Sequence, residues 1–93
     1  MDLYSGYAVV QRNELCRDQG LASIDNKDEC FKAAQCLVYP EEKLYFYTET
    51  DSTYPSGCYR SYDEPPVDDE FVVFFNYHQG GSRDEYSAPL CIW

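Results

Sequence analysis

Five cysteines stand in a chain of only 93 residues. A chain of this length buries only about 60–65% of the surface that its unfolded form exposes, so hydrophobic burial alone leaves it marginally stable. Cysteine at this density is typical of secreted and lumenal domains, in which disulfides add the missing stability. We therefore expect one disulfide-stabilised domain over residues 1–93, located extracellularly or in an organelle lumen, where conditions are oxidising.

The segment from Asp25 to Leu37 gives the clearest helix signal in the chain. Asp25 is the expected N-cap, and the acidic residues Asp28 and Glu29 suit the positive end of the helix dipole. Apolar residues recur at helical spacing and form a stripe that is expected to face the core. This stripe consists of Cys30, Phe31, Ala33, Ala34, Leu37 and Val38.

Five cysteines allow fifteen arrangements with two disulfides and one unpaired residue. Cys30 lies within the apolar stripe, whereas Cys36 falls roughly 240° further round the helix, on the flank away from the stripe. We therefore expect Cys30 to bond Cys58, at the start of a strand that the helix covers, and Cys16 to bond Cys91. No C-x-x-C pair or Cys/His cluster indicates a redox or metal role for these four residues.

Cys36, the remaining cysteine, has two interpretations. It is either a small apolar residue half-buried at the edge of the helix, or a free thiol that reacts or forms an intermolecular disulfide. The sequence leaves both open.

Four runs rich in β-branched and aromatic residues predict strands at residues 7–11, 44–48, 57–62 and 71–77. The last run is the least charged, and we expect it at the centre of the sheet, buried on both faces. The sequence therefore predicts an α+β fold in which one helix packs on a curved antiparallel sheet of about four strands.

Several short motifs occur in a fixed order: the helix I-x-x-x-x-E-C-x-x-A-A, then Y-P-x-G-C-Y, V-x-F-N, G-S and P-L-C, which begin at Ile24, Tyr54, Val73, Gly81 and Pro89. Together with Cys16, this order resembles a small four-cysteine domain that recurs in extracellular or lumenal proteins of algae and other protists. More loosely, the chain is similar to the apple/PAN class, in which a disulfide joins a helix to a curved antiparallel sheet. The resemblance implies a non-enzymatic module that binds proteins or glycans. Cys36 and the aromatic and acidic insert from Tyr39 to Thr53 depart from that pattern.

Seventeen acidic and seven basic residues give the chain a net charge of −10. This charge repels phosphate backbones and anionic lipid surfaces, so we expect no nucleic-acid partner. The longest apolar run, from Phe71 to Phe75, is too short to span a bilayer, and the N-terminus lacks the basic and apolar regions of a signal peptide. We expect a processed or excised soluble piece without membrane insertion.

Candidate catalytic and metal-binding residues are sparse. His78 is the only histidine, and Ser82 has no nucleophile-elbow motif around it. The acidic segment from Asp63 to Glu70 lacks the ligand spacing and the glycine of an EF-hand loop, so a solvated loop is favoured over a calcium site. We expect no enzymatic activity, no metal and no cofactor.

The chain contains ten tyrosines. Tyrosine provides a large contact area at a low entropic cost and is favoured at protein interfaces and sugar-stacking sites, although burial in a small core is the competing interpretation. The expected partner-binding residues are Tyr45, Tyr47, Tyr54, Tyr59 and Tyr62.

The function expected from the sequence is an interaction module that presents Tyr-rich and acidic loops to a protein or a glycan. The alternative is a structural or accessory subunit of a larger extracellular or organelle-lumen complex. An enzyme or enzyme inhibitor would require a pocket that converges on His78, or a rigid exposed loop such as Glu49 to Ser56.

Overall fold

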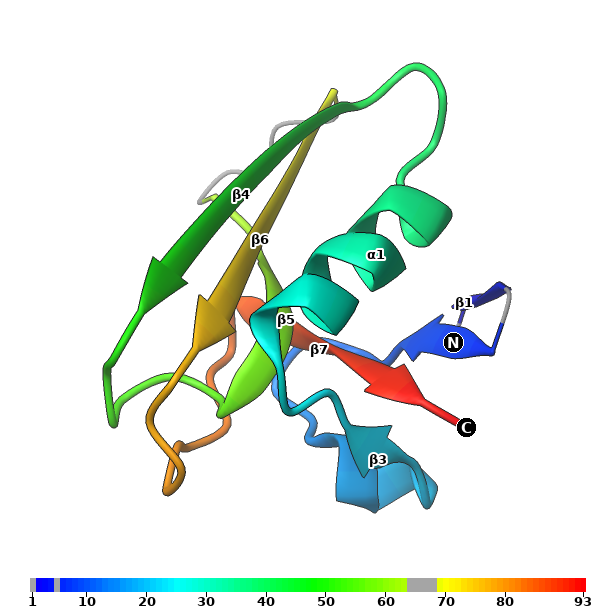
Figure 1. The fold of residues 1–93 in the computed structure, drawn as a ribbon. Helices are drawn as coiled ribbons and strands as arrows, with labels where there is room; N and C mark the ends of the chain where they lie inside the picture. Colours follow the sequence, from blue (N-terminus) through cyan, green and yellow to red (C-terminus); the bar gives the residue numbers. More distant parts are fainter. Residues whose placement is uncertain (1, 5, 64–68) are drawn as a thin grey trace.

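A computed structural model of the chain describes residues 2–4, 6–63 and 69–93 (Figure 1). These described residues form one α-helix, one short 3₁₀ helix and seven strands. The elements in chain order are β1 (Asp2–Tyr4), β2 (Tyr7–Val9), η1 (Cys16–Gln19), β3 (Ala22–Ser23), α1 (Lys27–Leu37), β4 (Lys43–Glu49), β5 (Gly57–Ser61), β6 (Glu70–Asn76) and β7 (Ser87–Ile92).

The strands form one sheet in the order β1-β2-β7-β5-β6-β4, and β3 also pairs with β7. The predicted α+β class with one helix is confirmed, but the sheet has seven strands rather than about four. It is also mixed, because β4 and β6 run parallel while the other pairs are antiparallel. The parallel pair arises because β6 lies between β4 and β5 in the sheet, although it follows both in the chain. Since β6 runs antiparallel to β5, it runs in the same direction as β4.

The centre of the sheet is β7 rather than β6. All residues from 87 to 91 are buried, because β7 lies between β2 and β5 and both of its faces are covered. In β6, Phe71, Val73 and Phe75 are buried under α1, whereas the residues between them are half-buried. The prediction that 71–77 is central and buried on both faces is therefore wrong, because α1 covers only one face of this strand.

Helix α1 packs across the sheet and begins two residues later than Asp25 (Figure 1). Its N-cap is Asn26, which has an extended backbone and whose side-chain oxygen accepts a 2.7 Å hydrogen bond from the Glu29 N–H. Asp25 is therefore not the cap. Most of the predicted stripe is buried, but the Phe31 side chain is 40% exposed because it lies at the edge of the sheet against the Phe46 ring.

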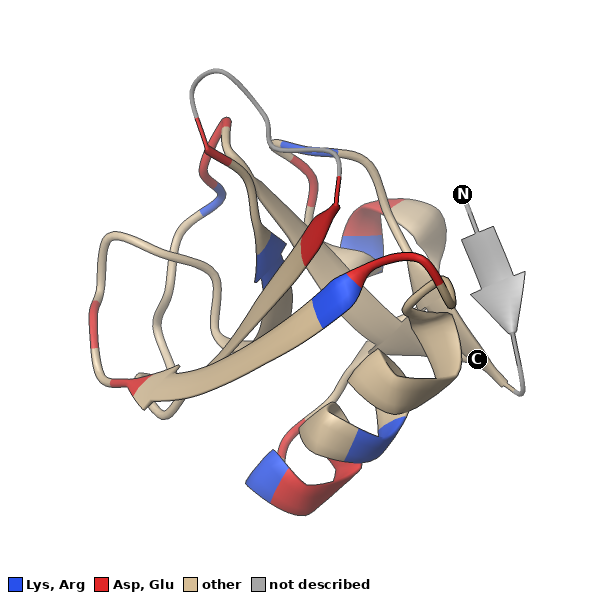
Figure 2. Cartoon of the chain, turned by 90° about the horizontal axis from the view of Figure 1, so that it is seen from above, with Lys and Arg blue, Asp and Glu red and all other residues tan. Residues whose placement is uncertain are grey.

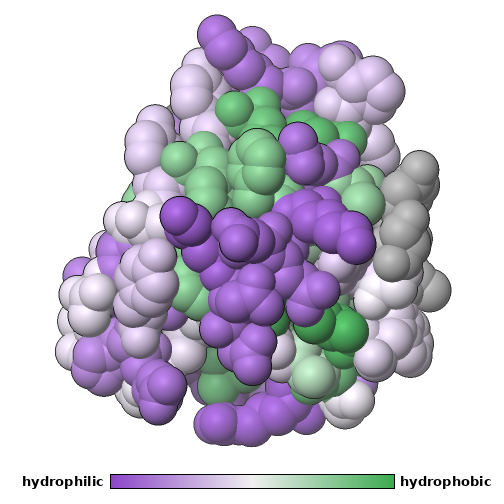
Figure 3. All heavy atoms as spheres, viewed as in Figure 1, coloured by the Kyte–Doolittle hydropathy of each residue, from purple (hydrophilic) through white to green (hydrophobic). Residues whose placement is uncertain are grey.

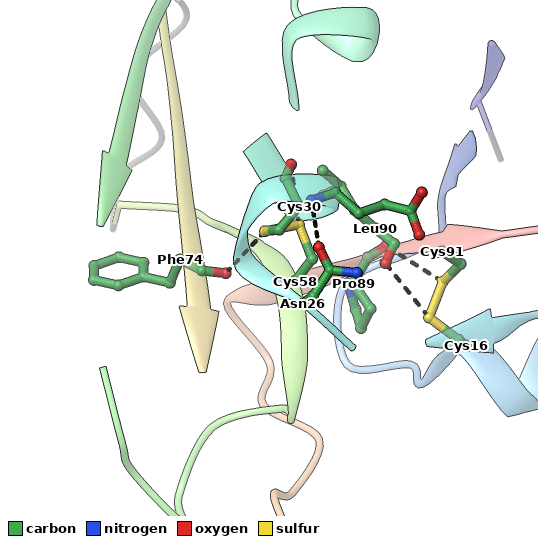
Figure 4. Close-up of a disulfide and its surroundings, with 9 residues drawn as sticks. Cys16, Asn26, Cys30, Cys58, Phe74, Pro89, Leu90 and Cys91 are labelled. Carbon is green, nitrogen blue, oxygen red and sulfur yellow. Dashed lines mark hydrogen bonds between the residues drawn. A yellow bond between two sulfur atoms is a disulfide. The ribbon is translucent and has the colours of Figure 1, made fainter. Parts of the chain in front are cut away.

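Two disulfides lie on opposite faces of the sheet (Figure 4). Cys30 of α1 is bonded to Cys58 of β5 with a Cα–Cα distance of 5.3 Å, and Cys16 of η1 is bonded to Cys91 of β7 at 5.7 Å. These are the two pairs expected from the sequence. The first lies in the larger apolar cluster beneath α1, and the second lies in a smaller cluster formed with Ala8, Val10 and Leu21.

Cys36 is half-buried and has no disulfide partner. It packs against the larger cluster instead of pointing away from it. This burial agrees with a half-buried apolar residue, and an intermolecular disulfide at Cys36 stays a prediction.

Candidate partner-binding face

The face of β4, β5 and β6 that is turned away from α1 carries a row of four aromatic rings. The row runs from Tyr47 through Phe74 and Tyr59 to Tyr54, with centroid separations of 5.3, 5.6 and 6.0 Å. Alternation along the strands places Tyr47, Phe74 and Tyr59 on this face, because their neighbours Phe46, Phe75 and Cys58 pack in the apolar cluster beneath α1. Tyr54 joins them from the loop between β4 and β5. We call these four residues the aromatic row.

The two ends of the aromatic row are open to solvent and its middle is not. Tyr47 is 50% exposed and Tyr54 is 36% exposed, whereas Phe74 is half-buried and Tyr59 is only 2% exposed. Tyr45 lies on the same face of β4 and is half-buried, with the Lys43 ammonium 5.6 Å from its ring centroid. The open ring surface is therefore provided mainly by Tyr47 and Tyr54.

Tyr59 supports the row instead of presenting a surface of its own. Its hydroxyl donates a hydrogen bond to the Glu49 carboxylate. Burial, followed by this hydrogen bond, raises the pKa of Tyr59, so the phenol remains a neutral donor. The prediction that Tyr59 contacts a partner is wrong for this structure, because neighbouring rings cover it.

The loop that carries Tyr54 is held by one buried amide. The Asn76 side-chain nitrogen donates to the carbonyl oxygens of Asp51 at 2.7 Å, Pro55 at 3.0 Å and Tyr54 at 3.3 Å. Its side-chain oxygen accepts from the N–H groups of Asp51 at 3.0 Å and His78 at 3.1 Å. Asn76 is 2% exposed and ends β6, so it fixes the loop to the sheet.

A second loop, which contains Gly81 and Ser82, is hydrogen-bonded to the loop that carries Tyr54. The Gly81 N–H donates to the Ser56 hydroxyl at 2.7 Å, and the Ser82 N–H donates to the Tyr54 carbonyl at 3.1 Å. A Cβ atom on Gly81 would lie 2.3 Å from the Tyr54 carbonyl oxygen. Only glycine allows this close approach of the two backbones.

Two carboxylates, those of Glu49 and Asp51, act electrostatically on the Tyr59 phenol within the row. Glu49 lies at the end of β4, and Asp51 accepts hydrogen bonds from the Thr53 hydroxyl at 2.6 Å and the Thr53 N–H at 2.9 Å. These hydrogen bonds lower the pKa of Asp51, so its carboxylate stays ionised at a lower pH than an ordinary aspartate. We call Glu49 and Asp51 the acidic rim.

Tyr62, the fifth predicted tyrosine, lies outside the aromatic row. It follows the end of β5, and its ring lies 4.6 Å from the Arg60 guanidinium and 5.5 Å from that of Arg12. Arg60 also lies 4.4 Å from the Phe71 ring centroid and forms a 3.2 Å ion pair with Glu42. Tyr62 therefore belongs to a separate cluster of stacked cations and rings.

Four of the five predicted tyrosines thus share one face, and sequence reasoning missed two further residues of that site. Phe74 was expected to be an ordinary core residue of the 71–77 strand. Asn76 had one visible signal, since it is the polar residue that ends an otherwise apolar run. Apart from His78, its partners lie 21 to 25 residues away, in a loop whose path the sequence does not specify.

His78 lies outside the aromatic row, beside a cavity of about 550 Å³ between the β3–α1 connection and the end of β6. The His78 Nδ1 atom accepts a 3.1 Å hydrogen bond from the Gly80 N–H. In the described ranges, no three His, Cys, Asp or Glu side chains gather in a way that could hold a metal ion. The absence of catalysis remains a prediction, as does the solvated state of the acidic segment Asp63–Glu70, of which residues 64–68 lie outside the described residues.

No protein-family model matches the chain, and no curated protein or solved structure matches it either. The resemblance to the four-cysteine algal domain and to the apple/PAN class stays a prediction. Within the part of the chain that the structure describes, no helix is long and apolar enough to cross a membrane. The two disulfides indicate that the chain folds in an oxidising compartment.

Proposed function

We propose that this protein is a non-enzymatic interaction module of an extracellular or lumenal compartment, and that its aromatic row and acidic rim bind a Lys/Arg-rich segment of a protein partner. The observation that carries the proposal is that the exposed rings of Tyr47 and Tyr54 end a row whose central Tyr59 lies beside the carboxylates of Glu49 and Asp51.

Cationic side chains suit both parts of this face. Guanidinium and ammonium groups are attracted to tyrosine ring faces, and carboxylates form charge-assisted hydrogen bonds with the same groups. The net charge of −10 adds a long-range attraction that speeds the encounter with a basic partner (Figure 2).

The face is also pre-organised. Asn76 and Gly81 fix the loop that holds Tyr54, so little conformational entropy is lost when a partner binds. A glycan would stack on the same tyrosines, but the acidic rim adds no attraction for a neutral sugar and repels an acidic one. A basic protein segment is therefore favoured over a glycan.

The test uses synthetic peptides rich in Arg and Lys, with matched peptides in which each basic residue is replaced by Ser. Titration followed by amide chemical shifts is expected to perturb residues around Tyr47, Phe74 and Tyr54 selectively. Tyr47→Ala and Tyr54→Ala should each weaken binding of the basic peptides by about tenfold, the scale of one partly desolvated cation–π contact. The control is Tyr39→Ala, because Tyr39 is 53% exposed and follows α1, outside the aromatic row.

Equal binding of the basic and Ser-substituted peptides, or chemical-shift changes confined to another face, would refute the proposal. A neutral glucose oligosaccharide titrated in the same way tests the glycan alternative. Binding of that sugar to Tyr47 and Tyr54, without binding of basic peptides, would establish the glycan in place of the protein segment.

A structural subunit of a larger assembly is the second candidate function. It is favoured by exposed large apolar side chains that lie outside the aromatic row, namely Phe31, Tyr77 and Trp93. An assembly would bury such side chains. Cross-linking of the native complex, followed by identification of peptides that contain these residues, tests this candidate.

A further inference from the structure

The edge of the sheet at β4 is long and unpaired in the described part of the chain. β4 is the last strand in the sheet order, and its seven residues pair with β6 alone. Natural sheets usually protect such an edge with proline, a bulge or an inward-pointing charge, because free backbone groups template pairing with another chain. Between Lys43 and Glu49, β4 contains no proline and no charged residue.

The backbone groups at this edge can be assigned from the hydrogen bonds to β6. The Lys43 N–H donates to the Asp69 carbonyl at 2.8 Å, and the Glu49 carbonyl accepts from the Tyr77 N–H at 2.9 Å. In a parallel ladder, alternate residues direct both backbone groups to the same neighbour. Lys43, Tyr45, Tyr47 and Glu49 therefore bond β6, and Leu44, Phe46 and Thr48 direct theirs to the free edge.

The sequence of β4 is complementary to itself in the antiparallel direction. Pairing two copies about Phe46 places Lys43 opposite Glu49 of the second copy, Leu44 opposite Thr48, and Tyr45 opposite Tyr47. Each end therefore gains an opposite-charge pair, because β4 has a basic residue at one end and an acidic residue at the other (Figure 2). Three aromatic pairs lie between them: two of Tyr45 with Tyr47 and one of Phe46 with itself. This register joins all seven residues and keeps every side chain on its own face of the sheet.

The same pairing of two β4 strands explains the exposure of the Phe31 side chain. Its ring packs edge-on against Phe46 at 5.2 Å, yet its side chain is 40% exposed. Together with Thr48 and Lys27, these rings line an open groove of about 600 Å³ between β4 and α1. Apolar surface is exposed on the side of the molecule that carries these two elements (Figure 3). In the paired register, Leu44 and Phe46 of the second copy would enter this groove and cover both phenylalanines.

We propose that the β4 edge pairs with the β4 edge of a second copy in the antiparallel register centred on Phe46, which makes a twofold symmetric dimer with a continuous sheet. Leu44, Phe46 and Thr48 of each copy exchange six backbone hydrogen bonds across the axis. This inference goes beyond the proposed function, because it needs no partner protein. It also brings the Tyr45 and Tyr47 rings of both copies together on the outer face.

Sedimentation velocity of the intact, oxidised protein up to about 1 mM tests for the dimer, since that range detects association with a dissociation constant of the same order. A concentration-dependent shift from monomer to dimer is expected. A protein that stays monomeric over the whole range would overturn the proposal.

Substitution at Thr48 tests which edge is used. Its N–H faces the free edge, so Thr48→Pro removes no hydrogen bond of the monomer but blocks pairing. Thr48→Val keeps the N–H and the β-branched shape and serves as the matched control. Loss of the dimer with Pro and its retention with Val are expected, whereas a dimer that survives Thr48→Pro would place the interface elsewhere.

Lys43→Glu tests the register, because it places two carboxylates opposite one another at both ends of the paired strands. We expect at least a fivefold weaker dimer, and Lys43→Arg should retain it. Equal dissociation constants for both variants would exclude the register centred on Phe46.

Amide hydrogen exchange gives an independent readout that a general loss of folding would not produce. At concentrations that favour the dimer, the amides of Leu44, Phe46 and Thr48 should gain protection, while those of Tyr45 and Tyr47 are protected at all concentrations. Intermolecular nuclear Overhauser effects between the α-protons of Tyr45 and Tyr47 should accompany this pattern, because directly opposed pairs of this type bring Cα atoms close.

The proposed dimer and the proposed peptide site can be tested, and refuted, independently of one another. Thr48→Pro leaves the Tyr54 loop and the acidic rim intact, so this monomeric variant should still bind basic peptides. Peptide binding without dimer formation would refute only the edge pairing, and a dimer that binds no basic peptide would refute only the proposed function.

Discussion

At the scale of single residues, the Asn76 side chain connects the end of β6 to the loop that carries Tyr54. Asn76→Ala removes five hydrogen bonds and leaves buried backbone groups without partners, so we expect a loss of about 2–3 kcal/mol in the free energy of unfolding. Urea denaturation measures this loss. Binding of basic peptides should weaken as well, because Tyr54 is no longer fixed.

Asn76→Asp separates the two halves of this contact. The carboxylate keeps an acceptor for the N–H groups of Asp51 and His78 but cannot donate to the three carbonyl oxygens. We expect the Asn76→Asp variant to be less stable than the wild type and to hold the Tyr54 loop less tightly. An Asn76→Ala variant as stable as the wild type, with unchanged peptide affinity, would show that the amide does not hold the loop.

The Tyr59 phenol makes the fold sensitive to alkaline pH. Tyrosine in an unfolded chain ionises near pH 10, whereas burial and the hydrogen bond to Glu49 raise the pKa of Tyr59 in the folded state. The stabilisation is therefore fully present below about pH 10 and is lost as the pH rises further. The urea midpoint should fall above that pH, and the fall should be smaller in Tyr59→Phe. Tyr39→Phe, at an exposed position, is the control; an equal response of both variants would contradict this assignment.

Some of these residue roles are visible in the sequence and others are not. The helical position of Cys30 and the strand position of Cys58 predict their disulfide, because both depend on local periodicity. The burial of Tyr59 and the five bonds of Asn76 depend on a loop that folds back over the sheet, and no local pattern reports that contact.

At the scale of elements, each disulfide joins one helix to one face of the sheet. The loops that they close span 28 and 75 residues, for which the chain-entropy model gives about 3.6 and 4.5 kcal/mol as upper values. Cys30→Ala combined with Cys58→Ala should lower the free energy of unfolding by about 2–5 kcal/mol, because α1 is then held only by packing. Chemical denaturation under oxidising conditions measures the loss.

Cys36→Ser is the matched control for that experiment, because Cys36 lies on the same helix without a disulfide. Its half-buried position predicts a change of no more than about 1 kcal/mol. A larger loss in Cys36→Ser than in the double variant would mean that the disulfide contributes less than the packing at the helix flank.

The order of the strands was only partly predictable, because it depends on contacts between segments that lie far apart in the sequence. Local signals located α1, β2, β4, β5 and β6, but they predicted no strand at β7, which contains Pro89, a residue that is rare in central strands. In the structure β7 changes partners along its length, and Pro89 lies opposite Tyr59 of β5. The parallel pairing of β4 with β6 also escaped prediction, because it depends on which side of β6 the chain places β5.

At the scale of the whole molecule, most acidic side chains of the described residues form no ion pair with a basic side chain. The described residues contain two ion pairs, Arg60–Glu42 and Arg83–Asp18, against a net charge of −10 for the chain. Self-repulsion between unpaired carboxylates therefore opposes the compact state more than ion pairing supports it. The same excess charge is what the proposed basic partner would neutralise.

The melting temperature should therefore rise as NaCl increases from about 10 mM to 150 mM, because the screening length shrinks from about 30 Å to 8 Å. A gain of about 1 kcal/mol corresponds to roughly 4–8 °C for a domain of this size. Sulfate is unsuitable as the salt, because it stabilises folded proteins regardless of their charge. Glu41→Lys combined with Glu85→Lys changes two exposed sites and brings the net charge from −10 to −6, so this variant should respond less to NaCl. A melting temperature that falls with NaCl would instead show that the two ion pairs and the acidic rim contribute net attraction.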